Sequence, residues 1–171
     1  MDGTHSIQVA AEVTQRVWAN QIKALADHHI MLEGCLLKPN MVRSGEKCPT
    51  PSSIEEIAKW TVKVLNNTIP PAIPGINFLS GGMSEEDATL ALNAINRVPL
   101  KKPWTLSFSY GRALQVTVIK VWAGKDENIK KAQDALLLRA KANSLACQGK
   151  YTGGAGGEAA HQSTFEAKYT Y

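Results

Sequence analysis

A lysine ends an apolar stretch in the first third of the chain. Lys38 follows Leu36 and Leu37 in the run LEGCLLKPN and is followed at once by Pro39. An ammonium group is strongly hydrated and is rarely buried without a partner, so Lys38 can mark the point where a strand leaves the core for solvent. Alternatively, an apolar pocket holds the amine uncharged, the form in which a lysine acts as a nucleophile. The run alone leaves both interpretations open.

Serine, glycine and arginine residues end two later apolar stretches. They are Ser80, Gly81 and Gly82 after the first, and Ser109, Gly111 and Arg112 after the second. Paired glycines let backbone N–H groups approach a phosphate closely. A glycine and an arginine at a helix start add the helix N–H groups and a forked guanidinium. A Gly-Gly pair after a strand is more often a simple turn, so the prediction of a phosphate site depends on these groups recurring at strand ends.

Helices and strands alternate along the chain around these residues. Helical spacing of apolar residues predicts helices over 6–26, 51–67, 83–98, 112–124 and 126–150, and short apolar runs predict buried strands over 29–39, 76–82 and 103–111. The spacing predicts one buried face for the first helix, with Val13 and Val17 on it, and one for the last helix, with Ile129 and Leu136 on it.

Polar residues at three helix starts are predicted caps. Ser52 and Glu55, three residues apart, form the pattern of a capping box. Ser84 is followed by two glutamates, which the helix dipole favours in the first turn. Asp126 is the expected cap of the longest helix.

Short buried strands alternating with helices predict an α/β fold with parallel strands and right-handed crossovers. The carboxyl ends of such strands converge on one face, where ligands bind. Lys38, the glycine turns and Arg112 should therefore cluster. Only three strands are predicted, which leaves an open edge on each side of the sheet.

Composition excludes several classes of protein. The 171 residues are 44% hydrophobic and 20% charged, as in one globular domain. The net charge of +4 resides partly in basic pairs without interleaved aromatics, which does not support nucleic-acid binding. No apolar run reaches the ~20 residues that span a bilayer, and the N-terminus lacks a secretory pattern.

Cysteine and histidine spacing predicts no metal site. Cys35, Cys48 and Cys147 share no ligand spacing, and reduced thiols in a cytosolic compartment are the simplest interpretation. The adjacent His28 and His29 are poorly spaced for joint ligation.

The run around Lys38, HIMLEGCLLKPNMV, closely resembles the Schiff-base signature of class I fructose-bisphosphate aldolases. The family pattern is an aliphatic residue, any residue, an aliphatic or aromatic one, Glu-Gly, and Leu-Lys-Pro-Asn two residues further on. The matching residues are Ile30, Leu32, Glu33, Gly34, Leu37, Lys38, Pro39 and Asn40. FLSGGMSEE, PWTLSFSYGRALQ and RAKANSLACQGKYT also resemble family segments in the same order, so the resemblance covers essentially the whole chain.

The resemblance implies a role for each candidate residue. Lys38 would form the imine; Ser80, Gly81, Gly82, Ser109, Gly111 and Arg112 would bind a substrate phosphate; and Tyr171, which ends the mobile tail, would assist proton transfer. The implied enzyme is a cytoplasmic lyase of glycolysis and gluconeogenesis. It reversibly cleaves fructose 1,6-bisphosphate to dihydroxyacetone phosphate and glyceraldehyde 3-phosphate. The covalent imine replaces the zinc of a metal-dependent aldolase, so no cofactor or metal is implied.

The resemblance also implies an incomplete fold. The family fold is an eight-stranded (β/α)8 TIM barrel, and residues 1–150 resemble its last three βα units, followed by a glycine-rich mobile tail at 151–171. The family's acid/base glutamate, other active-site lysines and aspartate belong to upstream strands, and Glu33 is not that acid/base. We therefore expect Met1 to begin a truncated gene model, an alternative product or a fragment, inactive in isolation.

Two functions stay open. The first is an aldolase that is active when the upstream strands are present, commonly as a homotetramer. The second is a catalytically inactive aldolase fragment that acts as a sugar-phosphate or cytoskeletal binding module, since aldolases associate with actin. Coding sequence upstream of Met1 would favour the enzyme, and a stop codon there would favour the fragment.

Overall fold

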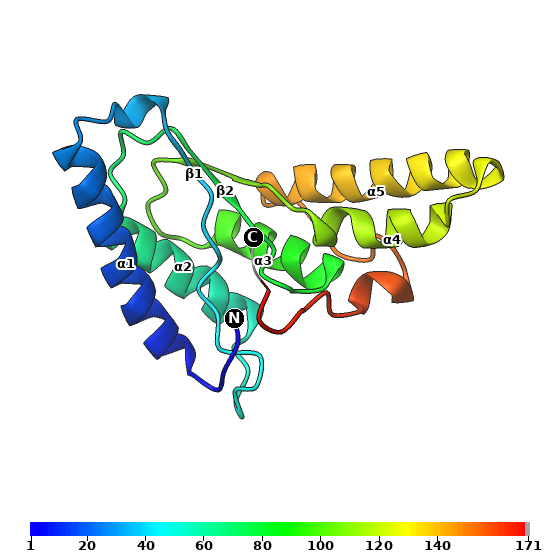
Figure 1. The fold of residues 1–171 in the computed structure, drawn as a ribbon, viewed down its shortest axis with the longest axis horizontal. Helices are drawn as coiled ribbons and strands as arrows, with labels where there is room; N and C mark the ends of the chain where they lie inside the picture. The colour runs from blue at the N-terminus through cyan, green and yellow to red at the C-terminus, as the bar shows by residue number, and fades with distance from the viewer. Residues whose placement is uncertain (170–171) are drawn as a thin grey trace.

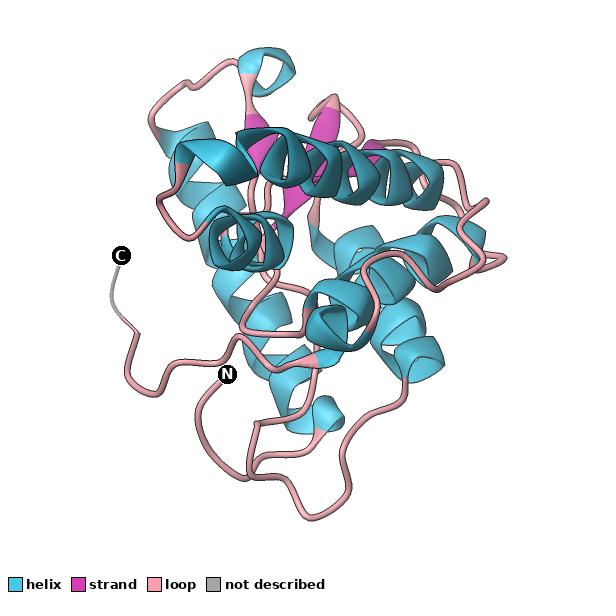
Figure 2. Ribbon diagram, turned by 90° about the vertical axis from the view of Figure 1, so that its right-hand side faces the viewer, coloured by secondary structure: helices cyan, strands magenta, loops and turns pink. Residues whose placement is uncertain are grey.

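Three short strands pair in parallel (Figures 1 and 2). The computed structural model describes residues 1–169, and its sheet has the order β1 (Leu36–Leu37), β2 (Gly75–Phe78), β3 (Thr105–Phe108). The register places Leu37 opposite Ile76 and Ile76 opposite Leu106. The predicted parallel α/β arrangement is therefore confirmed, although each strand is shorter than predicted.

Five α-helices accompany the sheet in the described chain. They are α1 (Ile7–Asp27), α2 (Ile54–Thr68), α3 (Glu85–Arg97), α4 (Arg112–Trp122) and α5 (Ile129–Cys147), with 3₁₀ turns η1 (Leu32–Gly34), η2 (Asp126–Asn128) and η3 (Glu158–His161). Figure 1 shows α1 and α2 at one side, α4 and α5 at the other, and α3 between them. All five predicted helices are confirmed, with ends that differ by at most three residues. Within residues 1–169, no helix is long and apolar enough to cross a membrane.

The capping box of α2 lies one residue later than the predicted Ser52–Glu55 pair. The Ser53 hydroxyl accepts from the Glu56 N–H at 3.2 Å, and the Glu56 carboxylate accepts from the Ser53 N–H at 2.9 Å. Ser52 does not cap because its hydroxyl lies 3.1 Å from both the backbone nitrogen and the hydroxyl of Ser44.

The other two predicted caps have different outcomes. Ser84 caps α3 as predicted, since its hydroxyl accepts from the Asp87 N–H at 3.0 Å. The prediction for Asp126 is wrong, because the chain first makes the 3₁₀ turn η2 and α5 begins only at Ile129, without a side-chain cap.

The core lies between β2 and the two helices α2 and α3. Val62, Leu65, Ile76, Phe78 and Leu92 are all 0% exposed. These residues come from α2, β2 and α3, so the central strand is covered by the two helices that flank it in sequence.

The predicted buried faces of α1 and α5 are only partly buried. Val13 and Val17 are 44% and 47% exposed, and they continue a stripe that begins at Val9, with neighbouring valines four positions apart. Ile129 and Leu136 of α5 are also exposed. The periodicity is that of packed helices, but the described chain has no further element to cover these faces.

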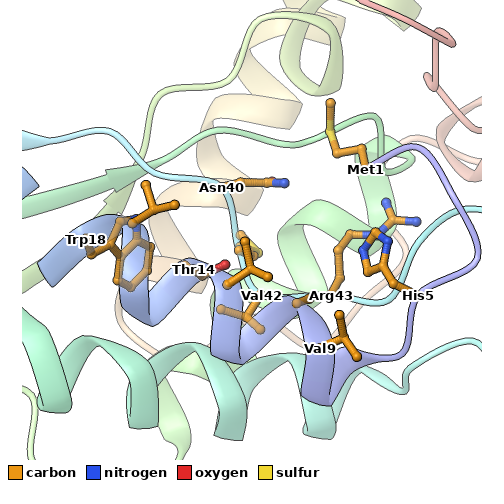
Figure 3. A pocket seen from close by; sticks show the side chains of 12 residues that line it. Met1, His5, Val9, Thr14, Trp18, Asn40, Val42 and Arg43 are labelled. Carbon is orange, nitrogen blue, oxygen red and sulfur yellow. The ribbon is translucent and has the colours of Figure 1, made fainter. Parts of the chain in front are cut away.

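A groove of about 410 Å³ lies between α1 and the segment that follows β1. Val9 and Trp18 of α1 line it together with Asn40 and Val42 of that segment, and all four are labelled in Figure 3. The Val42 N–H donates to Thr61 Oγ1 of α2 at 2.9 Å, which holds this segment against the core. The groove stays open because β1 is the edge strand of the sheet.

Arg139 of α5 is 1% exposed and joins α3 to the C-terminal segment. Its guanidinium donates to the carbonyl oxygen of Glu85 and to Thr89 Oγ1, each at 2.5 Å. It also donates to the carbonyl oxygen of Ala155 at 2.6 Å. Arg139 Nη1 lies 3.7 Å from Glu86 Oε2, and both of these side chains are buried.

Tyr151 ties the C-terminal segment to α3. Its hydroxyl donates to Glu86 Oε2 at 2.7 Å, and its N–H donates to Asn93 Oδ1 at 2.9 Å. Burial and the hydrogen bond to Glu86 raise the pKa of Tyr151. Ala160 is buried as well, so the packed part of the chain continues past residue 150. The mobility of residues 151–171 stays a prediction.

Replacing Arg139 by methionine should lower the free energy of unfolding by ~3–5 kcal/mol, because the buried Glu86 carboxylate loses its cation. Denaturant-induced unfolding measures the change. Lys141→Met on the exposed side of the same helix is the matched control and should change stability by less than ~0.5 kcal/mol. Equal effects of the two substitutions would contradict the stabilising role of Arg139.

Candidate active site

The carboxyl ends of the three strands line one cavity of about 300 Å³. Six of the predicted site residues lie on it: Lys38, Ser80, Gly81, Ser109, Gly111 and Arg112. The pairing continues past the strand ends, since the Leu79 N–H donates to the Pro39 carbonyl oxygen at 3.0 Å and the Ser109 N–H to that of Phe78 at 2.8 Å. This pairing brings the three predicted clusters together.

Gly82 lies beside the cavity and contacts the C-terminal segment. Its carbonyl oxygen accepts from the Thr164 N–H at 3.2 Å. A Cβ atom at this position would come within 3.0 Å of the Phe165 Cα. The remaining predicted residue, Tyr171, lies outside the described residues.

Lys38 follows β1 directly, and its side chain is exposed. It makes no hydrogen bond or ion pair with any residue in 1–169. The apolar pocket around the amine is therefore not formed by the described chain, and the solvent-exit interpretation describes its surroundings here. The reason is topological: β1 is an edge strand, so nothing pairs with its outer side.

The residues Ser80, Gly81 and Gly82 form a tight turn. The backbone is left-handed at Gly81, with φ +60°, and at Gly82, with φ +81°. The Met83 N–H donates to the Ser80 carbonyl oxygen at 3.1 Å. A Cβ atom at Gly81 would lie 2.3 Å from Asn40 Oδ1, so both the conformation and the available space require glycine there.

The guanidinium of Arg112 contacts the C-terminal segment. Its Nη1 donates to the Thr164 carbonyl oxygen at 2.5 Å, and its Cζ lies 4.5 Å from the centre of the Tyr169 ring. Arg112 Nη1 also lies 3.8 Å from Glu166 Oε1. The Glu166 side chain is 63% exposed, so solvent screens this ion pair. Gly111 precedes α4 without a side-chain cap, which leaves the N–H groups of Arg112 and Ala113 available to an anion, whereas the Leu114 N–H donates to the Gly111 carbonyl oxygen at 3.0 Å.

Tyr110 anchors the turn between Ser109 and Gly111. Its hydroxyl donates to the Ala88 carbonyl oxygen of α3 at 2.9 Å, and its ring centre lies 5.3 Å from that of Phe108. Burial raises the pKa of Tyr110, so the phenol stays protonated and keeps donating. The start of α4 is thereby fixed against α3.

Three further residues line the cavity and were not predicted: Leu79, Gln115 and Tyr169. Gln115 follows Arg112 by three residues in α4, and helical spacing alone could have found it. The contacts of Tyr169 could not be found, because a glycine-rich segment carries no periodicity that fixes its path.

The arrangement suits an anionic carbonyl compound. It combines an amine, a guanidinium, a glycine turn and the start of helix α4 at the carboxyl ends of the strands. Within the described part of the chain, no group of three or more His, Cys, Asp or Glu side chains is positioned to hold a metal ion.

Comparison with known proteins identifies one family. The sequence matches the family described as fructose-bisphosphate aldolase class-I over residues 1–171. It is 58% identical to fructose-bisphosphate aldolase 1 of Toxoplasma gondii, over 99% of this chain and 47% of that protein. It is 57% identical to the cytoplasmic isozyme of Spinacia oleracea, over 100% and 48% of the two chains.

A solved structure has the same fold as this chain. It is the fructose-bisphosphate aldolase from Plasmodium falciparum in complex with TRAP and a small-molecule inhibitor. The TM-score is 0.87 at 53% identity, with 90% of this chain and 44% of that chain covered. The chain thus spans about half the length of the relatives that it matches.

Gly81→Ala should destabilise the chain more than Gly124→Ala. Both glycines have a left-handed backbone, with φ of +60° and +70°, but only at Gly81 would a Cβ atom meet a neighbour within 4 Å. The strain of alanine at positive φ is ~1–2 kcal/mol at each site, and overpacking against Asn40 adds ~1–3 kcal/mol at Gly81. Denaturant-induced unfolding measures both, and equal losses would show that the contact with Asn40 is not tight.

Proposed function

The chain belongs to the class I fructose-bisphosphate aldolase family, and from this premise we propose that Lys38 is its Schiff-base lysine. This family uses a Schiff base and no metal. One observation carries the proposal: the cavity at the strand ends holds Lys38 together with Ser80, Gly81 and Arg112. An amine and a phosphate clamp within one cavity are what a phosphorylated ketone requires.

In the proposed reaction, the neutral amine of Lys38 attacks the ketone carbon of fructose 1,6-bisphosphate, and water leaves to give an iminium ion. The iminium nitrogen accepts the electron pair of the C3–C4 bond as that bond breaks. Glyceraldehyde 3-phosphate leaves, and an enamine remains on Lys38. Protonation of the enamine and hydrolysis then release dihydroxyacetone phosphate and restore the amine.

The proposed phosphate clamp consists of Ser80, Gly81, Gly82, Ser109, Gly111 and Arg112. Its physical basis is the left-handed glycine turn, the uncapped start of α4 and the guanidinium of Arg112. A phosphate at this position would take over the guanidinium donor that Arg112 gives to Thr164.

We propose that Tyr171 assists proton transfer at the dihydroxyacetone phosphate carbon. The position of the C-terminal segment supports this role, because Tyr169 lines the cavity and Tyr171 is two residues further along the chain. The proton of the C4 hydroxyl needs a separate base. In the family that base is a glutamate of an upstream strand, so this chain alone supplies no acceptor for it.

The proposed enzyme is therefore a cytoplasmic lyase whose active site needs upstream barrel strands in addition to β1, β2 and β3, as in a (β/α)8 barrel. The unpaired edge of β1 supports this view, because it leaves Lys38 exposed. The isolated 171-residue chain should lack cleavage activity, since losing an acid/base alone costs ~10²–10⁴ in rate. A homotetramer is proposed for the complete enzyme only.

A second candidate is a binding module without catalysis. The solved aldolase from Plasmodium falciparum is in complex with TRAP, so a relative with this fold has a protein partner. A chain with the clamp but without the acid/base could still bind sugar phosphates or a protein such as actin. Binding without turnover would favour this candidate.

Treatment of the complete enzyme, with its upstream strands present, with dihydroxyacetone phosphate and sodium borohydride should add a stable mass at Lys38, because borohydride reduces the imine to a secondary amine. Peptide mass spectrometry locates the adduct. Lys38→Arg should abolish the labelling, since arginine cannot act as the amine, whereas Lys150→Arg should leave it unchanged. Labelling that survives in Lys38→Arg would reject the assignment, and family-like turnover by this chain alone would reject the need for upstream strands.

In the complete enzyme, Arg112→Ala should weaken the binding of fructose 1,6-bisphosphate about ten- to a hundredfold, because a charge-assisted contact of ~1.5–3 kcal/mol is lost. Calorimetric titration measures the affinity. Lys120→Ala, near the other end of α4, removes the same charge away from the cavity and is the control. Unchanged affinity of Arg112→Ala for both phosphorylated substrates would show that the arginine is structural.

A further inference from the structure

A second cavity, of about 910 Å³, lies between α2 and α3. It shares no lining residue with the cavity at the strand ends. The two helices pack against each other, and the loop after α3 and the residues Tyr151 and Thr152 complete the walls. Its volume is in the range of small-molecule sites, which is ~300–1,000 Å³.

The floor of this cavity, here called the α2–α3 pocket, is apolar. Ala58 of α2 is 2% exposed, and Leu90, Ala94 and Val98 line the opposite side. Small side chains at Ala58 and Ala94 leave room between the helices. Such a floor suits an aliphatic or aromatic group and offers no partner to a polar one.

An accessible hydrogen-bond donor of a largely buried residue belongs to the lining of this pocket. Asn93 is 6% exposed and lines the pocket, and its Oδ1 is already used by the N–H of Tyr151 at 2.9 Å. Its Nδ2 donates to no acceptor within residues 1–169. Asn93 Nδ2 is not among the buried side-chain atoms that lack a partner in that range, which are Asn40 Oδ1 and Arg139 Nε, so this nitrogen is not fully buried. Because Asn93 lines the pocket, a bound molecule there is the acceptor that we expect for it.

The rim of the pocket adds two cations. Lys59 of α2 and Arg97 of α3 line it, and neither lies within 4.0 Å of a carboxylate oxygen of the described residues. The stem of Arg97 passes over Gly149, where a Cβ atom would come within 2.9 Å of the Arg97 Cγ. Glu55 is the one carboxylate on the lining, so the cations outnumber it.

We infer that the α2–α3 pocket binds an amphipathic monocarboxylate, with the apolar body on the alanine floor and the carboxylate at the rim. The available polar groups are donors: the Asn93 amide nitrogen, the Lys59 ammonium and the Arg97 guanidinium. A head group made only of acceptors and carrying negative charge matches all three. Because every lining residue belongs to this chain, the site does not depend on upstream strands and goes beyond the aldolase proposal.

The test uses the ¹⁵N-labelled 171-residue chain titrated with decanoate and, separately, with decanol. Decanoate should shift the side-chain NH₂ resonances of Asn93 saturably. Its affinity should exceed that of decanol about tenfold or more, because only the carboxylate accepts from the rim donors. Equal affinities, or shifts confined to the α1 groove around Val13 and Trp18 with Asn93 unmoved, would overturn the inference.

Two variants distinguish binding through these hydrogen-bond donors from nonspecific hydrophobic binding. Asn93→Asp keeps an acceptor for the Tyr151 N–H but replaces the amide donor by a carboxylate oxygen, and it should weaken decanoate binding about tenfold or more. Arg97→Gln should weaken it about three- to tenfold. Lys120→Gln, which removes a charge on α4, should change nothing. Unaltered decanoate affinity in both pocket variants would reject the site even if the wild-type chain binds decanoate.

Discussion

Parallel pairing is the constraint on which the candidate site depends. Because β1, β2 and β3 run in the same direction with matched register, their carboxyl ends meet at one edge, and Lys38, the glycine turn and Arg112 reach one cavity from distant positions in sequence. Hydrogen bonds beyond the strand ends, such as that from Leu79 to Pro39, extend this alignment into the loops. Without the pairing, each of these groups would be an isolated surface feature.

Buried hydrogen bonds and an ion pair among α3, α4 and α5, formed by Glu85, Glu86, Thr117 and Arg139, stabilise the helices that follow this edge of the sheet. Glu85 of α3 accepts from both the N–H and the hydroxyl of Thr117 in α4, at 3.1 and 2.5 Å, and its carbonyl oxygen accepts from Arg139 of α5. These buried hydrogen bonds therefore join the three helices, and water could take the place of either partner only if the helices separated. Since α4 begins at Arg112, the network also fixes the helix that carries the proposed clamp. Burying an ion pair costs desolvation, so its value here is positional as much as energetic.

Local pattern predicted the elements and the strand-end residues, because apolar spacing and turn chemistry are encoded within a few neighbours. The cap of α2 could not be predicted correctly, because the choice between Ser52 and Ser53 depends on Ser44. Ser44 lies only eight positions before Ser52, but the contact between them forms only when the loop folds back. The contacts of Thr164 and Tyr169 with Arg112 also depend on tertiary structure. Helical periodicity correctly predicted amphipathic helices, but it could not say which apolar faces this chain covers.

The unpaired side of β1 links the folding of this chain to its proposed chemistry. The exposed stripe of Val9, Val13 and Val17 and the open groove beside Asn40 flank the same strand that Lys38 follows. A strand paired with β1 and a helix laid over α1 would remove the valines from water, and they would also surround the amine. Exclusion of water is one of the conditions that keep a lysine amine uncharged and nucleophilic. The described chain therefore leaves both the apolar face of α1 and the amine of Lys38 in solvent.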